Sequence, residues 1–201
     1  MKAFLKNQVA NYGKWDFLVF TILTLLSILS GNTTVFYLIY FFWWNELIRL
    51  VVDWFFFKKN PNATVVSTQQ SIGFESFFLM GIYFVFLVVF FGFIANHDQM
   101  DILATNMEIL SFRNWFFNAN LLFVVAERIF LHRSEQELEI YFGGFTPSMI
   151  VLHVSIILGA MMIFFVVKRF PEVFTPENLW GSVVIAIPFL ILRWVVAKFI
   201  V

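Results

Sequence analysis

Long apolar segments constrain this chain more than any other feature of its sequence. A helix that spans a bilayer needs about 20 mostly apolar residues. Segments of roughly this length lie at 15–31, 33–57, 72–95, 112–131, 147–168 and 178–199. Turn-forming residues separate them, including Gly31-Asn32, Asn60-Pro61-Asn62 and Gly143-Gly144 before Pro147. The pattern predicts an all-α fold: a polytopic transmembrane helix bundle of about six spanning helices, in a single integral membrane domain over residues 1–201.

Composition narrows the class of protein further. With 61% hydrophobic and only 13% charged residues, the chain cannot cover a water-facing surface as an ordinary soluble domain does. The lipid bilayer is therefore its expected partner. A net charge of zero argues against nucleic acid as a partner, and the lack of cysteine excludes disulfides, Cys-ligated metal sites and thiol catalysis.

The basic residues predict the orientation of the bundle. Most of them fall on one side of a six-helix arrangement: Lys2, Lys6, Lys14, Lys58, Lys59, Arg128, Arg133 and Lys198. Because cytoplasmic loops are enriched in Lys and Arg, both the N- and C-termini are predicted to be cytoplasmic. The segment 96–110 is then an external loop, and its apolar residues suggest that it lies along the membrane interface.

The second segment carries charges inside an apolar run, FFWWNELIRLVVDWFFF. Glu46, Arg49 and Asp53 share one helix face at three- and four-residue spacing, as side-chain pairs do. One interpretation is a self-neutralising triad that faces inward and holds neighbouring helices in register. The other is an intramembrane functional site, because an unpaired charge at the bilayer centre costs at least about 2.5 to 3.5 kcal/mol. The sequence leaves both open.

The fourth segment is polar over a broad part of its surface. Asn114 and Asn118 share one face, and Asn120 lies on the adjacent face with Glu127 and Arg113. We expect the asparagines to form hydrogen bonds between helices.

Charges also mark the ends of the third and fourth segments. Glu75 lies near the cytoplasmic end of the third. Glu127 and Arg128 close the cytoplasmic end of the fourth, where we expect an interfacial ion pair rather than a functional site.

The fifth and sixth segments each bring one titratable or basic residue. His153 lies opposite Ser155 and Gly159, whose spacing suits close helix packing. It is either a hydrogen-bonded packing residue or a proton relay, since histidine titrates near neutral pH. Arg193 either extends toward the cytoplasm or pairs with the acidic residues.

These residues are predicted to converge on a polar pocket in the cytoplasmic half of the bundle. The predicted binding or proton-relay residues are Glu46, Arg49, Asp53, Asn118, His153 and Arg193. Residues with a secondary role are Asn45, Glu75, Asn114, Asn120, Glu127 and Arg128.

Three stretches carry a resemblance to a known family: WWNELIRLVVDW, FFLMGIYFVFLVVFFGF and TPSMIVLHVSIILGAMM. From about residue 33 onward the chain resembles the bacterial multi-pass membrane proteins grouped as domain of unknown function 6498. Leu152, His153, Ile156 and Gly159 match the family's fifth helix, whereas Asn45 and Glu46 stand in altered order. The histidines frequent in the family's third helix are missing. The resemblance implies a helical fold and a multi-pass location in the cell inner membrane, and no chemical activity.

Motifs of known enzymes are missing from the sequence, which favours a role without catalysis and predicts neither cofactor nor metal. The first candidate is a small transport, proton-relay or sensing protein that handles a small solute or protons. The alternative is a structural or accessory subunit of a membrane complex, with a second copy or another membrane protein as partner. An intramembrane lipid-modifying enzyme ranks behind both.

Overall fold

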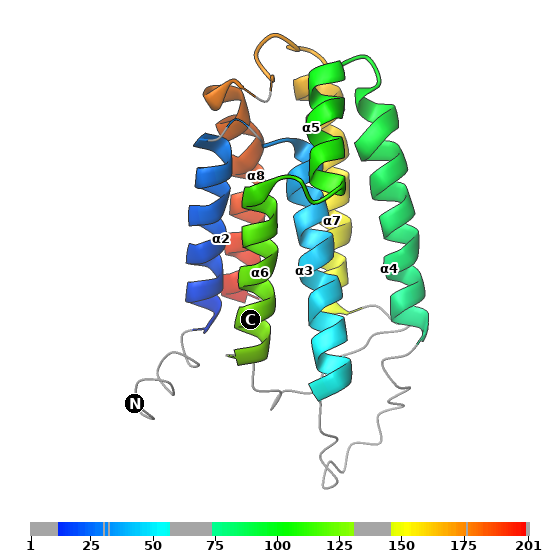
Figure 1. Ribbon diagram of the computed structural model, residues 1–201, viewed down its shortest axis with the longest axis vertical. Helices are drawn as coiled ribbons and strands as arrows, with labels where there is room; N and C mark the ends of the chain where they lie inside the picture. Colours follow the sequence, from blue (N-terminus) through cyan, green and yellow to red (C-terminus); the bar gives the residue numbers. More distant parts are fainter. Residues whose placement is uncertain are drawn as a thin grey trace, which may run out of the picture.

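The computed structural model describes residues 12–29, 31, 33–56, 74–130, 146–175 and 177–199, and the regular elements within these ranges are all helical (Figure 1). The predicted all-α class is therefore confirmed. The α-helices are α2 (Tyr12–Leu29), α3 (Val35–Phe56), α4 (Phe74–Phe86), α5 (Met100–Leu110), α6 (Trp115–Phe130), α7 (Pro147–Met162) and α8 (Leu179–Phe199).

Two of these helices continue in a different helical form. α4 runs directly into a π-helical turn, η1 (Leu87–Phe93), and a short 3-10 helix, η2 (Ile94–Asn96). α7 likewise continues into the π-helical segment η4 (Ile163–Val167). The π-helical form is rare and is often found at functional sites.

Within the described ranges, four helical stretches are long and apolar enough to cross a membrane: Val35–Val52, Glu75–Asn96, Met100–Ala126 and Met149–Val167. Shorter apolar stretches, Phe20–Leu29 and Leu179–Leu192, lie in α2 and α8. These helices indicate membrane association. Each of the six segments expected from the sequence is occupied by helix.

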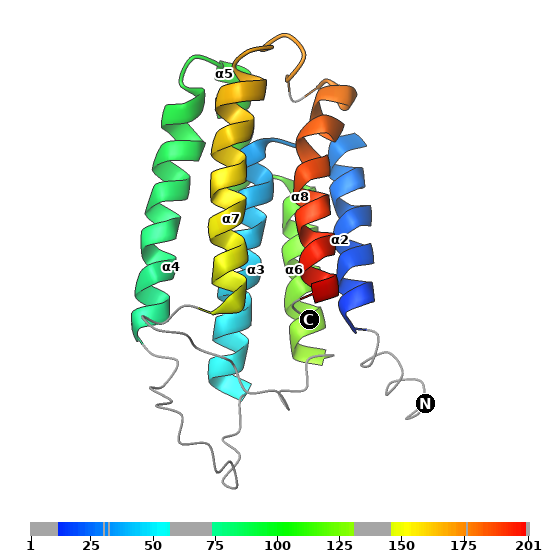
Figure 2. The same cartoon turned by 180° about the vertical axis from the view of Figure 1, so that it is seen from behind.

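Successive long helices run in opposite directions along the bundle. The end of α3 and the start of α4 lie at the lower end of Figure 1, together with the start of α2 and the end of α8. The α2–α3, η2–α5 and η4–α8 connections lie at the upper end, and Figure 2 shows the same arrangement from behind. At the α2–α3 connection, Gly31 adopts a left-handed φ of 72° and donates its N–H to the Ile28 carbonyl at 3.0 Å, which explains the expected tight turn there.

The central helix is α3, which packs against α4, α5, α6, α7 and α8. Its Tyr40 ring stacks on Phe117 of α6 with centroids 5.3 Å apart. Its Trp43 donates the indole N–H to the Met80 carbonyl of α4 at 2.9 Å. Ring stacking and indole hydrogen bonding are the ways in which large aromatic residues pack in a protein interior. Aromatic side chains thus fill the centre of the bundle.

The expectation of an interfacial loop over 96–110 is wrong. Residues 100–110 form α5, which packs against η1 and buries Ile102, Asn106 and Ile109. Their four- and three-residue spacing marks one face of an amphipathic helix. The apolar residues that suggested an interfacial position include Ile102 and Ile109, which are buried in the bundle instead.

α5 and α6 form one descending span that is interrupted between Ser111 and Asn114 (Figure 1). Phe112 has a left-handed φ of 57° in this break. Its carbonyl accepts a hydrogen bond from the Asn118 amide at 2.6 Å. Asn114 accepts the Phe117 N–H at 2.9 Å and thereby begins α6.

Candidate functional site

The buried carboxylate of Glu46 organises a polar site between α3 and α7. Arg49, one turn further along α3, donates from Nη2 to Oε1 at 2.8 Å and from Nε to Oε2 at 3.1 Å. Thr146, which immediately precedes α7, donates its hydroxyl to Oε1 at 2.6 Å. We call these three residues the Glu46 clamp. The predicted pairing of Glu46 with Arg49 is thus observed, and Thr146 is a partner that was not foreseen.

The start of α7 is built in a way that places Thr146 against the carboxylate. Thr146 is extended, with φ −100° and ψ 159°, and its hydroxyl oxygen accepts the Met149 N–H at 3.2 Å. Pro147 occupies the first helical position, where its missing N–H costs nothing. The positive end of the α7 dipole therefore lies next to the negative charge of Glu46.

The Glu46 carboxylate is buried, and both of its oxygens accept hydrogen bonds. The Glu46 side chain is 3% exposed and that of Arg49 is 16% exposed. Both carboxylate oxygens accept hydrogen bonds from the guanidinium, which binds in the two-pronged geometry typical of Arg–carboxylate pairs. The contacts hold the start of α7 against the middle of α3.

The other polar and charged residues predicted for this region are only partly described. Asn45 is buried beside Glu46, and its amide oxygen has no hydrogen-bond partner among the residues that the structure describes. Glu75 is exposed in the first turn of α4, and Arg128 is partly exposed in the last turn of α6. The side chains of Asp53, Glu127 and Arg193 lie outside the described part of the structure.

The three asparagines at the start of α6 and within it form different hydrogen bonds. The Asn120 amide donates to the Tyr37 hydroxyl of α3 at 2.7 Å, an interhelical hydrogen bond of the kind expected from the sequence. Asn114 and Asn118 instead serve the α5–α6 break, as the helix cap and the partner of the Phe112 carbonyl. None of the hydrogen bonds described for these asparagines joins them to the Glu46 clamp.

The described contacts of His153 are with α4 and not with the Glu46 clamp. Its side chain is exposed, and Nδ1 lies 3.1 Å from the Tyr83 hydroxyl of α4. The two rings meet edge to face with centroids 5.9 Å apart. Among the described contacts of His153, none reaches Glu46, so the predicted convergence of these two residues is not found. Ser155 and Gly159, on the opposite side, are buried where α7 meets α3, as their spacing predicts.

A second polar cluster, which sequence reasoning missed, lies near the upper end of the bundle. Thr34 at the start of α3 donates to the Asn106 amide oxygen of α5 at 2.8 Å. The Asn106 amide nitrogen lies 3.4 Å from the Phe91 carbonyl of η1, and Asn96 donates to the same carbonyl at 2.8 Å. The π-helical turn leaves this carbonyl available to side-chain donors, and the cluster satisfies it.

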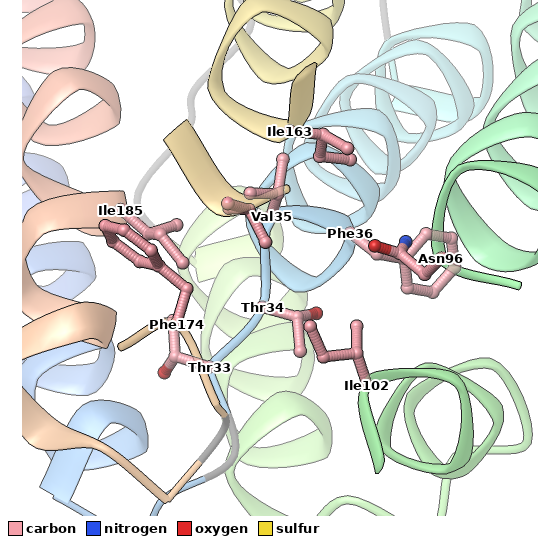
Figure 3. Close-up of a pocket in the computed structure, with 10 residues that line it drawn as sticks. Thr33, Thr34, Val35, Phe36, Asn96, Ile102, Ile163, Phe174 and Ile185 are labelled. Carbon is pink, nitrogen blue, oxygen red and sulfur yellow. The ribbon is translucent and has the colours of Figure 1, made fainter. Parts of the chain in front are cut away.

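A small pocket adjoins this upper cluster (Figure 3). Thr33, Thr34 and Asn96 contribute its polar atoms, and Ile163 of η4 and Ile102 of α5 are among its apolar walls. Its interior space is about that needed for a single water molecule. Neither Glu46 nor Arg49 lines it, so this pocket is separate from the one predicted around those residues.

The chain matches no known family profile, no curated protein and no solved structure. The resemblance based on the Trp-rich and His153 segments therefore stays a prediction. Within the described ranges, no group of three or more His, Asp or Glu side chains is placed to hold a metal ion.

Proposed function

We propose that this protein is a multi-pass membrane protein that acts as a structural or accessory subunit of a membrane complex. The observation that carries the proposal is the engagement of both Glu46 carboxylate oxygens by Arg49 and Thr146. A group that binds a solute or relays a proton needs an oxygen that the ligand can reach. Here the oxygens link two helices instead.

The energetics of buried charges support the same reading. Removing one partner of a buried ion pair costs about 3 to 5 kcal/mol, because the other charge is left uncompensated. Glu46 and Arg49 avoid that cost by pairing within one helix, and Thr146 extends the pair to α7. The clamp therefore fixes how the two helices pack.

The cellular setting is also a proposal. We place the six helical segments across a bacterial inner membrane with both termini in the cytoplasm. The alternating helix directions support this topology (Figures 1 and 2), as does the excess of Lys and Arg on one side of the predicted spans. Membership of the domain of unknown function 6498 group belongs to the same proposal.

Transport, proton relay or sensing is the second candidate, and the upper end of the bundle favours it more than Glu46 does. A span broken at 111–114 is a feature that transporters use near their binding sites, and π-helical turns such as η1 are often found at functional sites. Thr34, Asn96 and Asn106 supply neutral oxygen and nitrogen atoms there. A lipid-modifying enzyme has less support, because the described pocket is far too small for an acyl chain.

Glu46→Gln separates the first two candidates. A structural clamp predicts a loss of thermal stability and of any stoichiometric membrane partner that co-purifies with the wild-type protein. Replacing the whole pair, Glu46→Leu with Arg49→Leu, should recover most of the stability, because apolar residues can substitute for a buried ion pair. Glu75→Gln is the matched control, since that carboxylate is exposed in the first turn of α4.

A relay role predicts the opposite pattern. Glu46→Gln would then keep the protein level and melting temperature of the wild type and lose uptake or pH-dependent flux in proteoliposomes. The double leucine variant would be equally inactive. That combination of results would overturn the structural assignment.

A further inference from the structure

Exposed charged side chains lie along the outer side of α5 and of the break that follows it. Asp101, Ala104, Glu108, Ser111 and Arg113 are all exposed, and we call them the outer α5 face. Residues 101, 104, 108 and 111 fall within one narrow stripe at 100° per residue. Among the residues that the structure describes, the carboxylates of Asp101 and Glu108 and the guanidinium of Arg113 have no hydrogen bond or ion pair.

Contacts on the inner side of α5 show how far this face lies below the upper end of the apolar span Glu75–Asn96. The Asn106 amide nitrogen lies 3.5 Å from the Gly92 carbonyl, and Gly92 lies within the apolar span Glu75–Asn96. Gly92 is four residues from the upper end of that span, or about 6 Å at the helical rise. Glu108, two residues further down α5 than Asn106, is then about 9 Å below that end.

An exposed charged side chain at this depth must be shielded from the hydrocarbon core. The hydrocarbon core is about 30 Å thick, so Glu108 and the still deeper Arg113 lie within the range that it occupies along Glu75–Asn96. Charged side chains within membrane spans nearly always face protein or water, and they pair with each other. Among the described residues, none covers the outer α5 face or pairs with its charged side chains.

We propose that the outer α5 face is the contact surface between two copies of this chain, related by a two-fold axis along the bundle. The face carries both signs of charge, so it complements itself. In a two-fold interface each residue pair occurs twice, and Arg113 of one copy meets Glu108 of the other in both directions. Two ion pairs therefore close the interface.

The local geometry suits this pairing. Two copies in one membrane have the same orientation, so their α5 helices run side by side in the same direction. The Arg113 N–H donates to the Glu108 carbonyl at 2.8 Å, which places the two residues on adjoining turns. A long guanidinium side chain can therefore reach the carboxylate on the neighbouring helix. Ala104 and Ser111, seven residues apart on the stripe, are small enough for the two helices to approach closely.

Disulfide cross-linking tests the contact directly, because the chain contains no cysteine. Ala104→Cys and Ser111→Cys are introduced singly into the full-length protein, reconstituted in proteoliposomes and oxidised with copper phenanthroline. Both should form covalent dimers at least about tenfold more efficiently than Gly81→Cys. Gly81 is the matched control, since it is exposed on α4 and a side chain there meets no atom within 4 Å.

Charge reversal then tests the ion pairs. Glu108→Arg and Arg113→Glu, each in the Ala104→Cys background, should lower dimer formation by more than about tenfold, because like charges then face each other. The combination of the two reversals should restore it. Size-exclusion chromatography in detergent checks that each variant is folded. If a reversal variant aggregates, Glu108→Gln and Arg113→Gln replace it and should show a smaller loss of the same kind.

Other occupants of the face would give different results, and each would overturn the proposal. Monomers alone with Ala104→Cys, or no recovery in the double reversal, exclude the two-fold contact. Labelling of Ala104→Cys by a membrane-impermeant maleimide without cross-linking points to a water-filled space. An anionic phospholipid retained in native mass spectrometry and lost in Arg113→Gln, without dimers, points to lipid as the partner of the arginine.

Discussion

Thr146 donates its hydroxyl to Oε1 of Glu46 across 2.6 Å, although 100 residues separate them along the chain. The same hydroxyl oxygen accepts the Met149 N–H, so one side chain both begins α7 and ties it to α3. Helix capping and interhelical attachment thus depend on a single oxygen atom. Substitutions at Thr146 should show this double role.

Thr146→Val should destabilise the bundle by about 2 kcal/mol, because it removes the helix cap and one hydrogen bond to a charged group while keeping the shape of the side chain. Thr146→Ser keeps the hydroxyl and should lose little. Unfolding in mixed micelles measures both. Equal stability of the valine and serine variants would contradict the role of the hydroxyl.

The upper polar cluster predicts coupling between Thr34 and Asn106, whose side chains are 2.8 Å apart. A double-mutant cycle with Thr34→Val and Asn106→Leu should give a coupling energy of about 0.6 kcal/mol, the average for hydrogen bonds in a membrane protein, and at most about 1.7 kcal/mol. Thr105→Val in place of Thr34→Val is the control, because its hydroxyl bonds within α5 to the Asp101 carbonyl. That control pair should be additive.

Two glycines should respond in opposite directions to alanine. A Cβ at Gly181 would collide with the Val173 carbonyl oxygen and lie 3.3 Å from Phe174 Cα, so Gly181→Ala should cost about 1 to 3 kcal/mol. Gly81 in α4 has open space around it, and Gly81→Ala should stabilise the helix by about 0.5 to 1 kcal/mol. Melting temperatures of the two variants against the wild type decide the matter, and a shift of the same sign in both would refute the packing argument.

The exposed Tyr83–His153 pair should contribute little to stability. Tyr83→Phe removes the hydroxyl that lies 3.1 Å from His153 Nδ1, and about 0.6 kcal/mol is the average for such a bond in a membrane protein. His153→Phe should give a similar loss, and combining the two should cost no more than either alone. A loss above 2 kcal/mol in Tyr83→Phe would show that the hydroxyl has a further partner.

The sequence allowed the helical class and the position of the long helices to be predicted, because apolar length is a local property. The Glu46–Arg49 pair was predictable for the same reason, since its spacing lies within one helix turn. Thr146 also had a visible signal: a threonine before a proline at a helix start is a common cap. Its contact with Glu46 had no such signal, because it depends on how α7 packs on α3.

Two other features depended on tertiary packing. α5 was missed because its buried face contains Asn106, which looks polar in sequence and becomes a core residue through Thr34 and the carbonyls of η1. His153 was assigned to the interior because its depth in α7 was predictable and its direction was not. Its partner, Tyr83, could be identified only from the packing of α4 against α7.

The order in which a ribosome delivers these segments to the membrane gives the Glu46–Arg49 pair a further consequence. α3 leaves the translocon long before α7 has been synthesised, so Thr146 is not yet present when Glu46 first meets lipid. Arg49, the counter-ion of Glu46, lies three residues further along α3 and enters the membrane together with it. The span Val35–Val52, whose only charged residues are Glu46 and Arg49, can therefore partition into hydrocarbon with no net charge, ready to receive α7 later.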